Sequence, residues 1–313
     1  MPPRWQAPPH PDDQDGYLSQ AYAQTLAHLG TPRRLPRSGG WILARPIPGT
    51  DRTDGMGVYP FLCCRDWSAL ADDLEELSDD LVCVSLVTDP FAPVSAADLD
   101  AVFDLTRPFK VHQVADLSQP TEQIVSRHRL RFARRALERL DMVVSEQPRE
   151  LLEDWLPMYD GLVRRHGISG VQALTPAALE QLMEVPGLVG IRADLDGEPV
   201  GMHLELHQGD VVYGHLSASS ELGYRVGVSS ALHLFEIEHF RGRAAWIGGG
   251  GAAGLADGDD DGLVTFKRGF ANATRTVHLC GRVFDPAAYA RLSATAGSAP
   301  PDYFPRYRHR DFT

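Results

Sequence analysis

Residues 188–217 read LVGIRADLDGEPVGMHLELHQGDVVYGHLS, and this stretch decides the fold class of the chain. Apolar and polar residues alternate through much of it, and Asp196-Gly197 is a pair typical of a two-residue hairpin turn. A second turn is expected at Gln208-Gly209. The pattern therefore predicts an antiparallel meander of three strands, at Leu188–Leu195, Glu198–His207 and Asp210–Ser217.

The expected turn at Gln208-Gly209 fixes the register of the second and third strands. The register pairs His207 with Asp210, Glu205 with Val212, His203 with Gly214 and Gly201 with Leu216. This side of the hairpin is polar and carries two glycines, whereas the opposite side is apolar and is expected to be core. The polar side is either the floor of a groove or a solvated outer face. In the first case His203 and Glu205 are candidate general bases or acceptor-binding groups.

Helices and further strands are expected on both sides of the meander. Upstream, Arg127–Leu140 predicts a basic amphipathic helix whose arginines lie largely off the apolar stripe. A strand at Asp141–Glu146 and helices at Pro148–His166 and Thr175–Met183 follow it. Downstream the sequence predicts a loop at 219–228, a helix at Ser229–Phe240, a strand at Ala244–Ile247 that ends in glycines 248–251, a short helix at 262–270, a strand at Thr276–Phe284 and a helix at Pro286–Leu292.

The N-terminal half has its own alternation of elements. Strands are expected at Trp41–Ile47, Val58–Cys63, Leu81–Thr88 and Phe109–Val114. Helices are expected over residues 17–29, over residues 66–77 and after Ser95, which has the side chain of a helix N-cap. This order predicts an α/β layer rather than a helix bundle or a sandwich.

Composition narrows the class of protein. A chain of 313 residues, 43% of them hydrophobic, can bury one large core or two medium ones, and its length favours two domains. The net charge of −12 argues against a protein that binds duplex DNA, because phosphate neutralisation requires Lys and Arg. No stretch approaches the ~20 apolar residues of a membrane span. Residues 1–16 are expected to be a disordered tail without the apolar region of a signal peptide, which predicts a cytoplasmic protein.

The sequence predicts no metal site. The four cysteines lack the paired spacing of a zinc site and are expected to be reduced, buried thiols. The acidic segment Asp257–Asp261 resembles a Ca²⁺ loop only superficially, because its spacing is wrong and no glutamate follows at the required position.

From Ser126 to about Tyr289 the order of elements resembles the GNAT fold. The arginine-rich helix, the strand start Gly197-Glu-Pro-Val-Gly201 and the segment Asp261-Gly262-Leu-x-x-Phe266-Lys267-x-Gly269-Phe270 are similar to the Fem and BioF2-like (FemAB-type) acyltransferase branch. The resemblance implies an α/β (α+β) fold with a mixed, splayed sheet flanked by helices. It also implies two GNAT-like units in tandem, a degenerate one at residues 17–125 and a complete one at residues 126–313.

The resemblance implies an N-acyltransferase without a tightly bound cofactor. Its co-substrate is either aminoacyl-tRNA, whose acceptor end would then be a partner, or acyl-CoA. The acyl group would pass to an amine of a small-molecule, cell-envelope or secondary-metabolite acceptor. CoA-dependent members carry a Gln/Arg-x-x-Gly-x-Gly/Ala loop, and here the matching stretch is Tyr224-Arg-Val-Gly227-Val-Ser229. This departure slightly favours the aminoacyl-tRNA donor. An acyl-CoA-dependent N-acetyltransferase and a catalytically silent GNAT-like binding module are the alternatives.

The candidate site residues come from both lines of reasoning. Lys267 is expected to meet the oxyanion or a donor phosphate, because the family's matching lysine lies in the reaction cleft, and it joins His203 and Glu205 as a catalytic candidate. An ordinary surface lysine is the alternative. The N–H groups of Ser229 and Ser230, with Arg225 alongside, could hold an anion at a helix N-terminus. The full set of candidate donor- and substrate-binding residues is Phe266, Tyr224, Arg225, Gly227, Ser229, Ser230, Gly248, Gly249, Arg127 and Arg131.

Overall fold

The computed structural model describes residues 15–250, 262–294, 303–309 and 311. The chain divides into two compact units. Unit 1 comprises Met1–Gly16, Val111–Ile168 and Thr175–Arg275, and unit 2 comprises Tyr17–Lys110, Ser169–Leu174 and Thr276–Thr313. The expectations for the tail, in residues 1–14, and for the acidic segment Asp257–Asp261 lie outside the described residues.

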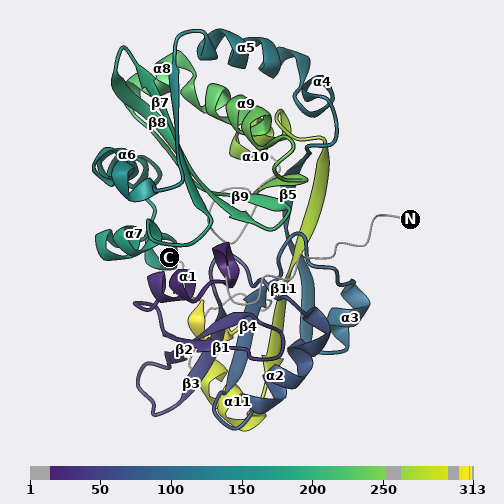
Figure 1. Cartoon of the computed structure of the whole chain (residues 1–313). Coiled ribbons are helices and arrows are strands. Elements are labelled where there is room, and N and C mark those ends of the chain that lie inside the picture. The colour runs from purple at the N-terminus through teal and green to yellow at the C-terminus, as the bar shows by residue number, and fades with distance from the viewer. Residues whose placement is uncertain (1–14, 251–261, 295–302, 310, 312–313) are drawn as a thin grey trace. The chain divides into compact units, whose positions relative to one another are not determined.

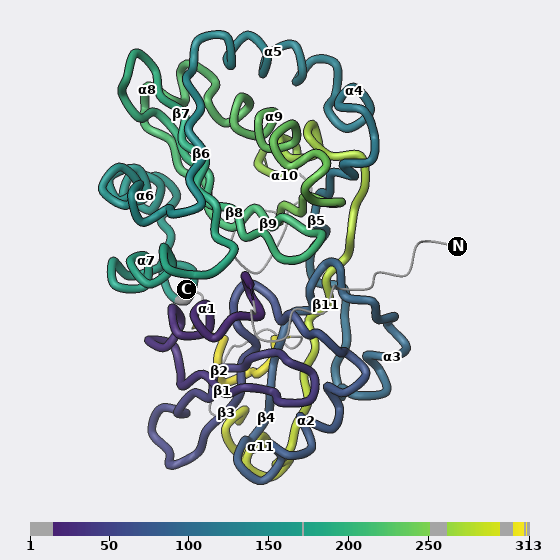
Figure 2. The backbone as a smooth tube through the Cα atoms, in the orientation of Figure 1, coloured from purple at the N-terminus to yellow at the C-terminus, as the bar shows by residue number. Residues whose placement is uncertain are grey.

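Unit 1 is built on a mixed sheet whose strand order is β5-β10-β9-β8-β7-β6. All neighbouring pairs whose register is known are antiparallel except β9 and β10, which run parallel. Figure 2 shows the backbones of β7, β8 and β9 side by side. The strands are β5 (Leu105–Asp116, through its residues 111–116), β6 (Asp141–Ser145), β7 (Leu188–Leu195), β8 (Glu198–Gln208), β9 (Val211–Ser219) and β10 (Trp246–Gly249).

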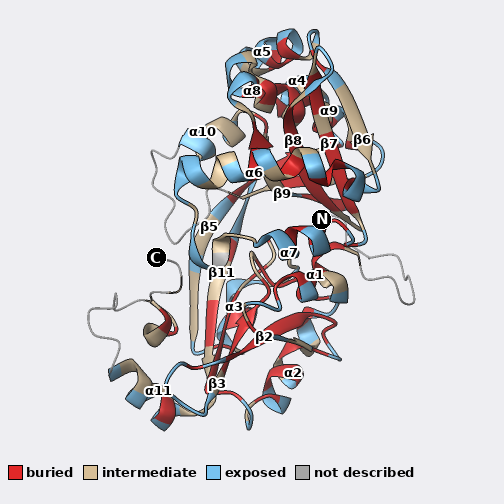
Figure 3. Ribbon diagram, turned by 90° about the vertical axis from the view of Figure 1, so that its left-hand side faces the viewer, coloured by how far each residue is buried: buried red, intermediate tan, exposed pale blue. Residues whose placement is uncertain are grey.

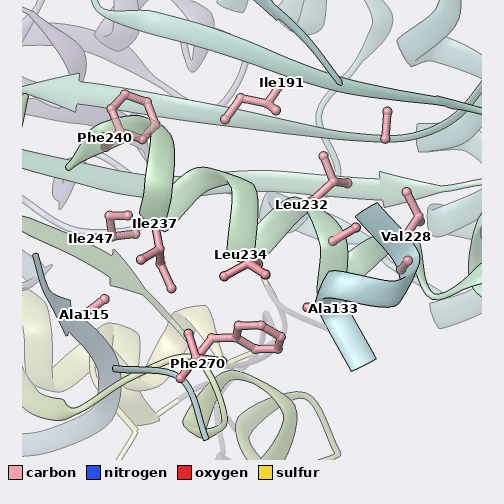
Figure 4. Packing of buried hydrophobic residues seen from close by; sticks show 14 of the residues in the cluster. Ala115, Ala133, Ile191, Val228, Leu232, Leu234, Ile237, Phe240, Ile247 and Phe270 are labelled. Carbon is pink, nitrogen blue, oxygen red and sulfur yellow. The ribbon is translucent and has the colours of Figure 1, made fainter. Parts of the chain in front are cut away.

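Helices cover both faces of this sheet. On one face, α9 packs on β7, β8 and β9, and α5 packs on α9, while α6 contacts β8 and β9 from the other face (Figure 1). The buried cluster between the sheet and α9 is apolar and includes Ile191, Leu232 and Phe240 (Figure 4). The helices are α4 (Thr121–Ile124), α5 (Arg127–Leu137), α6 (Leu152–His166), α7 (Pro176–Leu182), α8 (Glu221–Val226), α9 (Val228–Phe240) and α10 (Gly262–Arg268).

The amphipathic pattern of α5 decides how this helix lies. Leu130, Ala133 and Ala136 are buried, whereas most of its arginines are exposed (Figure 3). Apolar residues at helical spacing place one stripe against the core and leave the charged face to solvent. The basic amphipathic helix that the sequence predicts is therefore confirmed, although it ends at Leu137 rather than Leu140.

The register of β8 and β9 differs from the predicted one. The turn lies at Gly209-Asp210, so Gln208 pairs with Val211, and a bulge between Leu204 and Glu205 shifts the register again. Glu205 thereby faces Gly214 instead of Val212, and the remaining pairs are His207 with Val212, His203 with Ser217 and Gly201 with Ser219. The predicted register is wrong because Gly209, with φ of 58°, takes the left-handed first position of the turn, which moves the hairpin by one residue.

The sheet parts between β9 and β10. The two strands pair from Val211 with Trp246 to Tyr213 with Gly248, but β9 continues to Ser219 while β10 ends at Gly249. Beyond Tyr213 no pairing with β10 holds β9 in the described part of the sheet. The predicted mixed, splayed sheet flanked by helices is confirmed.

The strands of unit 2 follow the order β1-β2-β3-β4-β11. Strand β3 runs parallel to β4, and the other pairs are antiparallel. Its main apolar cluster contains Ile42, Leu74 and Val84. All four cysteines of the chain are buried free thiols. The elements are α1 (Gln20–Thr25), β1 (Thr31–Arg34), β2 (Trp41–Pro46), β3 (Thr53–Gly57), α2 (Leu70–Glu76), β4 (Cys83–Val87), α3 (Ala96–Asp100), β11 (Ala273–Val283) and α11 (Pro286–Ala294).

One predicted strand of unit 2 is wrong. Residues Val58–Cys63 form only an isolated bridge at Leu62, and the polar segment before them is strand β3 instead. Pro60 lacks the N–H that a central strand needs, whereas the buried Asp54 of β3 finds its partners in Arg45 and Arg308. Ser95 caps α3 with a capping box, as the sequence predicts.

Contacts group the chain differently from the predicted boundary at residue 126. Residues 111–125 cluster with unit 1, and residues 276–313 cluster with unit 2. The reason is that each sheet takes one strand segment from the other half of the sequence: β5 pairs with β10, and β11 pairs with β4. The tandem organisation with domains at 17–125 and 126–313 stays a prediction.

Candidate active site

Two catalytic candidates lie on the face of β8 that α9 covers. The side chains of His203 and Glu205 are each 2% exposed, because α9 packs over them. A solvated outer face is therefore excluded for this side of the hairpin. Gly214 of β9 lies next to Glu205, since a Cβ atom placed there would be 3.5 Å from Glu205 Oε2 and 3.5 Å from the carbonyl oxygen of Gly248. The carboxylate of Glu205 thus sits where β9 and β10 part.

His203 lies between two carboxylates. Its Nδ1 atom is 3.3 Å from Oε1 of Glu205 and 3.4 Å from Oε2 of Glu236, which comes from α9. Both contacts lack the direction of a full hydrogen bond. Within the described residues neither ring nitrogen of His203 nor Oε2 of Glu205 has a hydrogen-bond partner. Buried polar atoms without a hydrogen-bond partner are uncommon, and they are typical of sites that exchange a proton or bind a ligand group.

The charges of this cluster follow from burial and from its neighbours. Burial disfavours the charged form of His203, but the two carboxylates outweigh it and raise the pKa of His203 to about 9. Burial and the negative charge of Glu236 raise the pKa of Glu205 to about 7, against the opposing effects of His203 and Lys267. Near neutral pH, His203 is therefore a cation, and Glu205 can either accept or release a proton.

His233 completes the cluster one turn before Glu236 on α9. Its Nδ1 atom lies 2.9 Å from the carbonyl oxygen of Ser229, and its ring meets the ring of His203 edge to face at 4.6 Å. Burial and the positive charges of His203 and Lys267 hold the pKa of His233 well below its usual range. A neutral imidazole must then donate from Nδ1 to the carbonyl, which leaves Nε2 as an acceptor.

Lys267 reaches the end of β10 from α10. Its ammonium group donates a hydrogen bond to the carbonyl oxygen of Gly250. A Cβ atom at Gly249 would lie 3.6 Å from Lys267 Nζ, and one at Gly250 would lie 3.0 Å from the ring of His112. The backbone at the end of β10 therefore passes between a lysine and a histidine, and only at Gly250 is the contact too tight for a Cβ atom to fit easily. Lys267 and Glu205 thus both border the end of β10 at Gly248 and Gly249, and their catalytic role stays a prediction.

Aromatic rings pack behind this lysine. The ring of Phe266 lies 5.1 Å from His233 and 5.2 Å from Phe270, and the guanidinium of Arg129 lies 5.0 Å from the Phe266 ring. The backbone of Gly269 also accommodates Arg129, because a Cβ atom there would be 2.7 Å from its side chain. A packed ring and a stacked arginine fix the position of α10 and hence of Lys267.

One group of side chains here has a composition that metal ions use. His203, His233 and Glu236 each offer one ligand atom, and these atoms lie within 4.8 Å of one another. The positive charge of Lys267, which acts on both Glu205 and His233, opposes a cation at this place. The protonated His203 already balances the carboxylates. We therefore interpret the group as one that binds a proton.

The predicted donor-binding loop contains a helix that the sequence reasoning missed. Tyr224 and Arg225 lie in α8, and Gly227, with φ of 78°, joins α8 to α9. The N–H of Ser230 donates to the carbonyl oxygen of Gly227, so this expected anion contact is used within the helix. A Cβ atom at Gly227 would lie 2.5 Å from the ring of Phe132 on α5. This ring therefore lies against the start of α9, close to Ser229.

The remaining donor-site candidates are Arg127, Arg131, Tyr224 and Arg225, and all four are exposed. Arg127 and Arg131 belong to the exposed face of α5. On α8 the ring of Tyr224 stacks with Arg165 at 4.1 Å, and Arg165 also pairs with Glu221. None of these contacts joins them to the buried cluster of His203, Glu205 and Glu236.

Four residues of the site escaped the sequence analysis. They are Glu236, His233, His112 and Arg129. His233 and Glu236 are three residues apart on a helix, a spacing that places two side chains on one face, and this was the signal that could have found them. His112 and Arg129 carry no such pattern, because only the packed structure places them beside Gly250 and Gly269, which follow β10 and α10.

None of the helices that the structure describes combines the length and the apolar character needed to cross a bilayer. Comparison with known proteins adds a domain match over part of the chain and the fold. A family model described as an acetyltransferase (GNAT) domain matches residues 125–244. No curated protein matches the sequence significantly.

Several solved structures share the fold of the whole chain. The crystal structure of FemX is 14% identical with a TM-score of 0.66, and the match covers 87% of this chain and 93% of that chain. The structure of L-PGS from Bacillus licheniformis is 12% identical with a TM-score of 0.58, covering 87% and 94%. A conserved protein of unknown function from Bacteroides thetaiotaomicron is 12% identical with a TM-score of 0.61, covering 87% and 92%. At these identities the likeness establishes the fold.

Proposed function

Because residues 125–244 form a GNAT domain and the chain shares the fold of FemX, we propose that it is an N-acyltransferase. One observation carries the proposal: where the sheet parts, the buried carboxylate of Glu205 and the ammonium group of Lys267 both border the end of β10. A base and a cation at one place are what acyl transfer to an amine requires.

Glu205 is the proposed base. An amine acceptor arrives largely as an ammonium ion and must lose a proton before it can attack. A carboxyl group with a pKa of about 7 accepts that proton at neutral pH far better than an exposed glutamate, because its proton affinity is closer to that of the donor. Oε2 of Glu205 is buried, and the exposed position of Gly214, where β9 carries no side chain, is the proposed side from which the acceptor reaches it.

Lys267 is the proposed stabiliser of the oxyanion. The amine nitrogen bonds to the acyl carbon, and the carbonyl oxygen becomes negatively charged. An ammonium carries three N–H donors, so its bond to Gly250 is compatible with a further contact to that oxygen. The bond from the acyl carbon to the donor oxygen, or sulfur, then breaks, and the leaving hydroxyl or thiol takes the second proton of the amine. Donor and acceptor react directly once they are aligned.

Aminoacyl-tRNA is the proposed donor. Phe132 packs on Gly227, and the Ser230 N–H is used within the helix, so the start of α9 differs from an open pyrophosphate site. Arg127 and Arg131 present charge on the exposed face of α5, where phosphates of an RNA end can be neutralised. The departure of Tyr224-Arg-Val-Gly227-Val-Ser229 from the CoA loop supports the same choice. Acyl-CoA is the second candidate.

The donor experiment separates these possibilities. Purified protein is incubated with tRNA charged with radiolabelled amino acids and with candidate amines, with and without ribonuclease. We expect label in an amide product that ribonuclease abolishes. In parallel, a clear rise in melting temperature with micromolar acetyl-CoA supports the CoA donor instead. Mass spectrometry of ligands that co-purify with the protein identifies the acceptor. If transfer and ligand binding are unchanged in both Lys267→Ala and His203→Ala, the site is wrong, and a silent binding module remains.

A further inference from the structure

The most unusual feature of unit 1 is a buried imidazole shared by two carboxylates. Glu205 and Glu236 come from a strand and a helix, and both approach the same nitrogen, Nδ1 of His203, at nearly equal distances of 3.3 and 3.4 Å. A single N–H can donate well to only one of them at a time. The proton of His203 therefore has two alternative acceptors, one of which faces the point where β9 and β10 part.

We propose that His203 and Glu236 are positioning residues that hold Glu205 ready to take the proton of the acceptor amine. The three side chains share protons as one unit. In this unit Glu205 lies at the point where β9 and β10 part, and Glu236 approaches His203 from α9. This inference rests on the proposed function for its catalytic meaning, but the shared proton is a property of the folded protein that can be measured without any reaction.

Charge balance favours this arrangement. Two carboxylates buried at one place repel each other, and the charged form of each is disfavoured by burial. His203 compensates from β8 and Lys267 from α10, while the neutral His233 of α9 contributes no charge. With one imidazolium and one ammonium against two carboxylates, the described groups are neutral as a set when both glutamates are ionised. Uptake of one proton by Glu205 makes the set positive by one charge.

The same geometry predicts opposite effects for the two positioning residues. Removing the negative charge of Glu236 makes it easier for Glu205 to ionise, so Glu205 can act as a base at lower pH. Removing the positive charge of His203 makes ionisation of Glu205 harder, so the base works only at higher pH. A neighbouring charge at this distance shifts a pKa by about 1 to 3 units. Loosening of the fold alone would lower activity for both variants without shifts in opposite directions.

The first arm of the test needs no substrate. Two-dimensional ¹⁵N spectra of the histidine rings, recorded from pH 5 to pH 10, report the charge of each ring, and His203→Asn identifies the signal. We expect the wild-type ring of His203 to be an imidazolium at pH 7 and to lose its proton about one unit lower in Glu236→Gln. The control is Glu238→Gln, because Glu238 lies on the same helix and is exposed. Cross-peaks to the ring of His233, 4.6 Å away, also assign the His203 signal in the wild-type protein, so the test does not depend on a folded variant. A neutral His203 ring at pH 7 in that protein overturns the inference.

The second arm uses the acyl transfer itself. The acid limb of the pH profile of kcat/KM should move down by about one unit in Glu236→Gln and up by about one unit in His203→Asn. Shifts in the same direction, or no shifts, count against the positioning role. If the ring spectra behave as expected but no acyl transfer is found with any donor, the shared proton stands and the proposed function fails. A stoichiometric transition metal in the purified protein, lost in His233→Ala, overturns the inference because a metal would replace the proton.

Discussion

The ammonium group of Lys267 donates a hydrogen bond to the carbonyl oxygen of Gly250, so a cation from α10 is held across the end of β10. Lys267 passes beside Gly249, where a Cβ atom would be in van der Waals contact with Nζ at 3.6 Å. The same strand end borders the carboxylate of Glu205 through the carbonyl of Gly248 and the position of Gly214. A positive and a negative group thus flank one short piece of backbone.

Replacement of Lys267 should abolish most of the activity without unfolding the protein. Lys267→Ala removes the proposed oxyanion contact, and loss of one such donor typically costs about 10²–10³-fold in kcat. Steady-state kinetics with the productive donor measure this. The matched control is Arg268→Ala, the next residue of the same helix, whose exposed side chain leaves activity within about twofold. Equal losses of activity in both variants would show that the substitutions act by disturbing the structure of α10 rather than by removing the charge of Lys267.

Stability should depend on pH through Glu205. The folded protein binds the proton of this carboxyl more tightly than the unfolded chain, because its pKa is raised from 4.5 to about 7. The free energy of unfolding therefore falls as the pH rises from about 4.5 to about 7, and the effect of His203, whose pKa is raised to about 9, continues that fall. His233 and His215, whose pKa values burial lowers, act oppositely, since the stability that they contribute is lost as the pH falls below 6.5.

Glu205→Gln removes the first of these effects and weakens the second, because Glu205 helps to raise the pKa of His203. The free energy of unfolding of this variant minus that of wild type should rise by on the order of 2 kcal/mol from pH 5 to pH 8. The reason is that wild type loses the contribution of Glu205 over this range, and one pKa unit corresponds to about 1.4 kcal/mol. Chemical denaturation at the two pH values measures the difference. Glu238→Gln, which lies on the exposed side of α9, should show no such change with pH. A constant difference between Glu205→Gln and wild type would contradict the raised pKa.

Gly227→Ala should destabilise unit 1 for two separable reasons. Its φ of 78° is unfavourable for any residue with a Cβ atom, and that atom would lie 2.5 Å from the ring of Phe132. We expect a loss of about 1 to 3 kcal/mol in denaturant unfolding. Adding Phe132→Ala should restore part of the loss by removing the clash but not the backbone strain. Full restoration by the second substitution would mean that the backbone at this position is relaxed.

The exposed arginines of α5 should matter for an RNA donor. The double variant Arg127→Ala and Arg131→Ala should raise KM for aminoacyl-tRNA several-fold and leave kcat unchanged. It should also flatten the salt dependence of log KM by about 1 to 2 units of slope, because each neutralised phosphate releases its counterion. The control is Arg149→Ala, an exposed arginine that pairs with Glu184. An unchanged salt slope would remove α5 from the donor site.

The buried ion pair of unit 2 should be worth far more than a surface pair. Arg308 binds Asp54 through two contacts, at 2.8 and 3.1 Å, and Asp54 is fully buried. Arg308→Ala leaves that carboxylate without its main partner, which typically costs about 3–5 kcal/mol. Arg33→Ala breaks the exposed pair with Asp80 and should cost less than about 1 kcal/mol. Urea unfolding followed by circular dichroism compares the two, and similar losses would contradict the buried geometry.

Local pattern was enough to predict many elements. The alternation in Leu188–Leu195 gave β7 with its observed bounds, because both faces of that strand obey a period of two. Asp196 and Gly197 both have positive φ, as the predicted turn requires. Thr175 and Ser95 act as helix caps, as their side chains predict. These features depend on neighbours within a few residues, and a single sequence contains that information.

The register of β8 and β9 could not be predicted in the same way. A turn at Gln208-Gly209 and one at Gly209-Asp210 are both compatible with the sequence, and the bulge at His215 is visible only from the pairing of Glu205 with Gly214. A shift of one residue changes every partner across a hairpin. The choice is made by what packs on each face, which is a property of the folded unit.

The sequence by itself determined the first candidates for the site of this protein: a lysine after Phe266, a histidine and a glutamate two positions apart on one strand, and glycines at a later strand end. Only the tertiary structure decided that His203 and Glu205 lie under α9 beside Glu236, with Lys267 close enough to act on Glu205. The physical reason is that charge and proton affinity depend on burial and on neighbours that are distant in the chain. A strand pattern specifies which side a residue faces, but the helix that covers that side sets its environment.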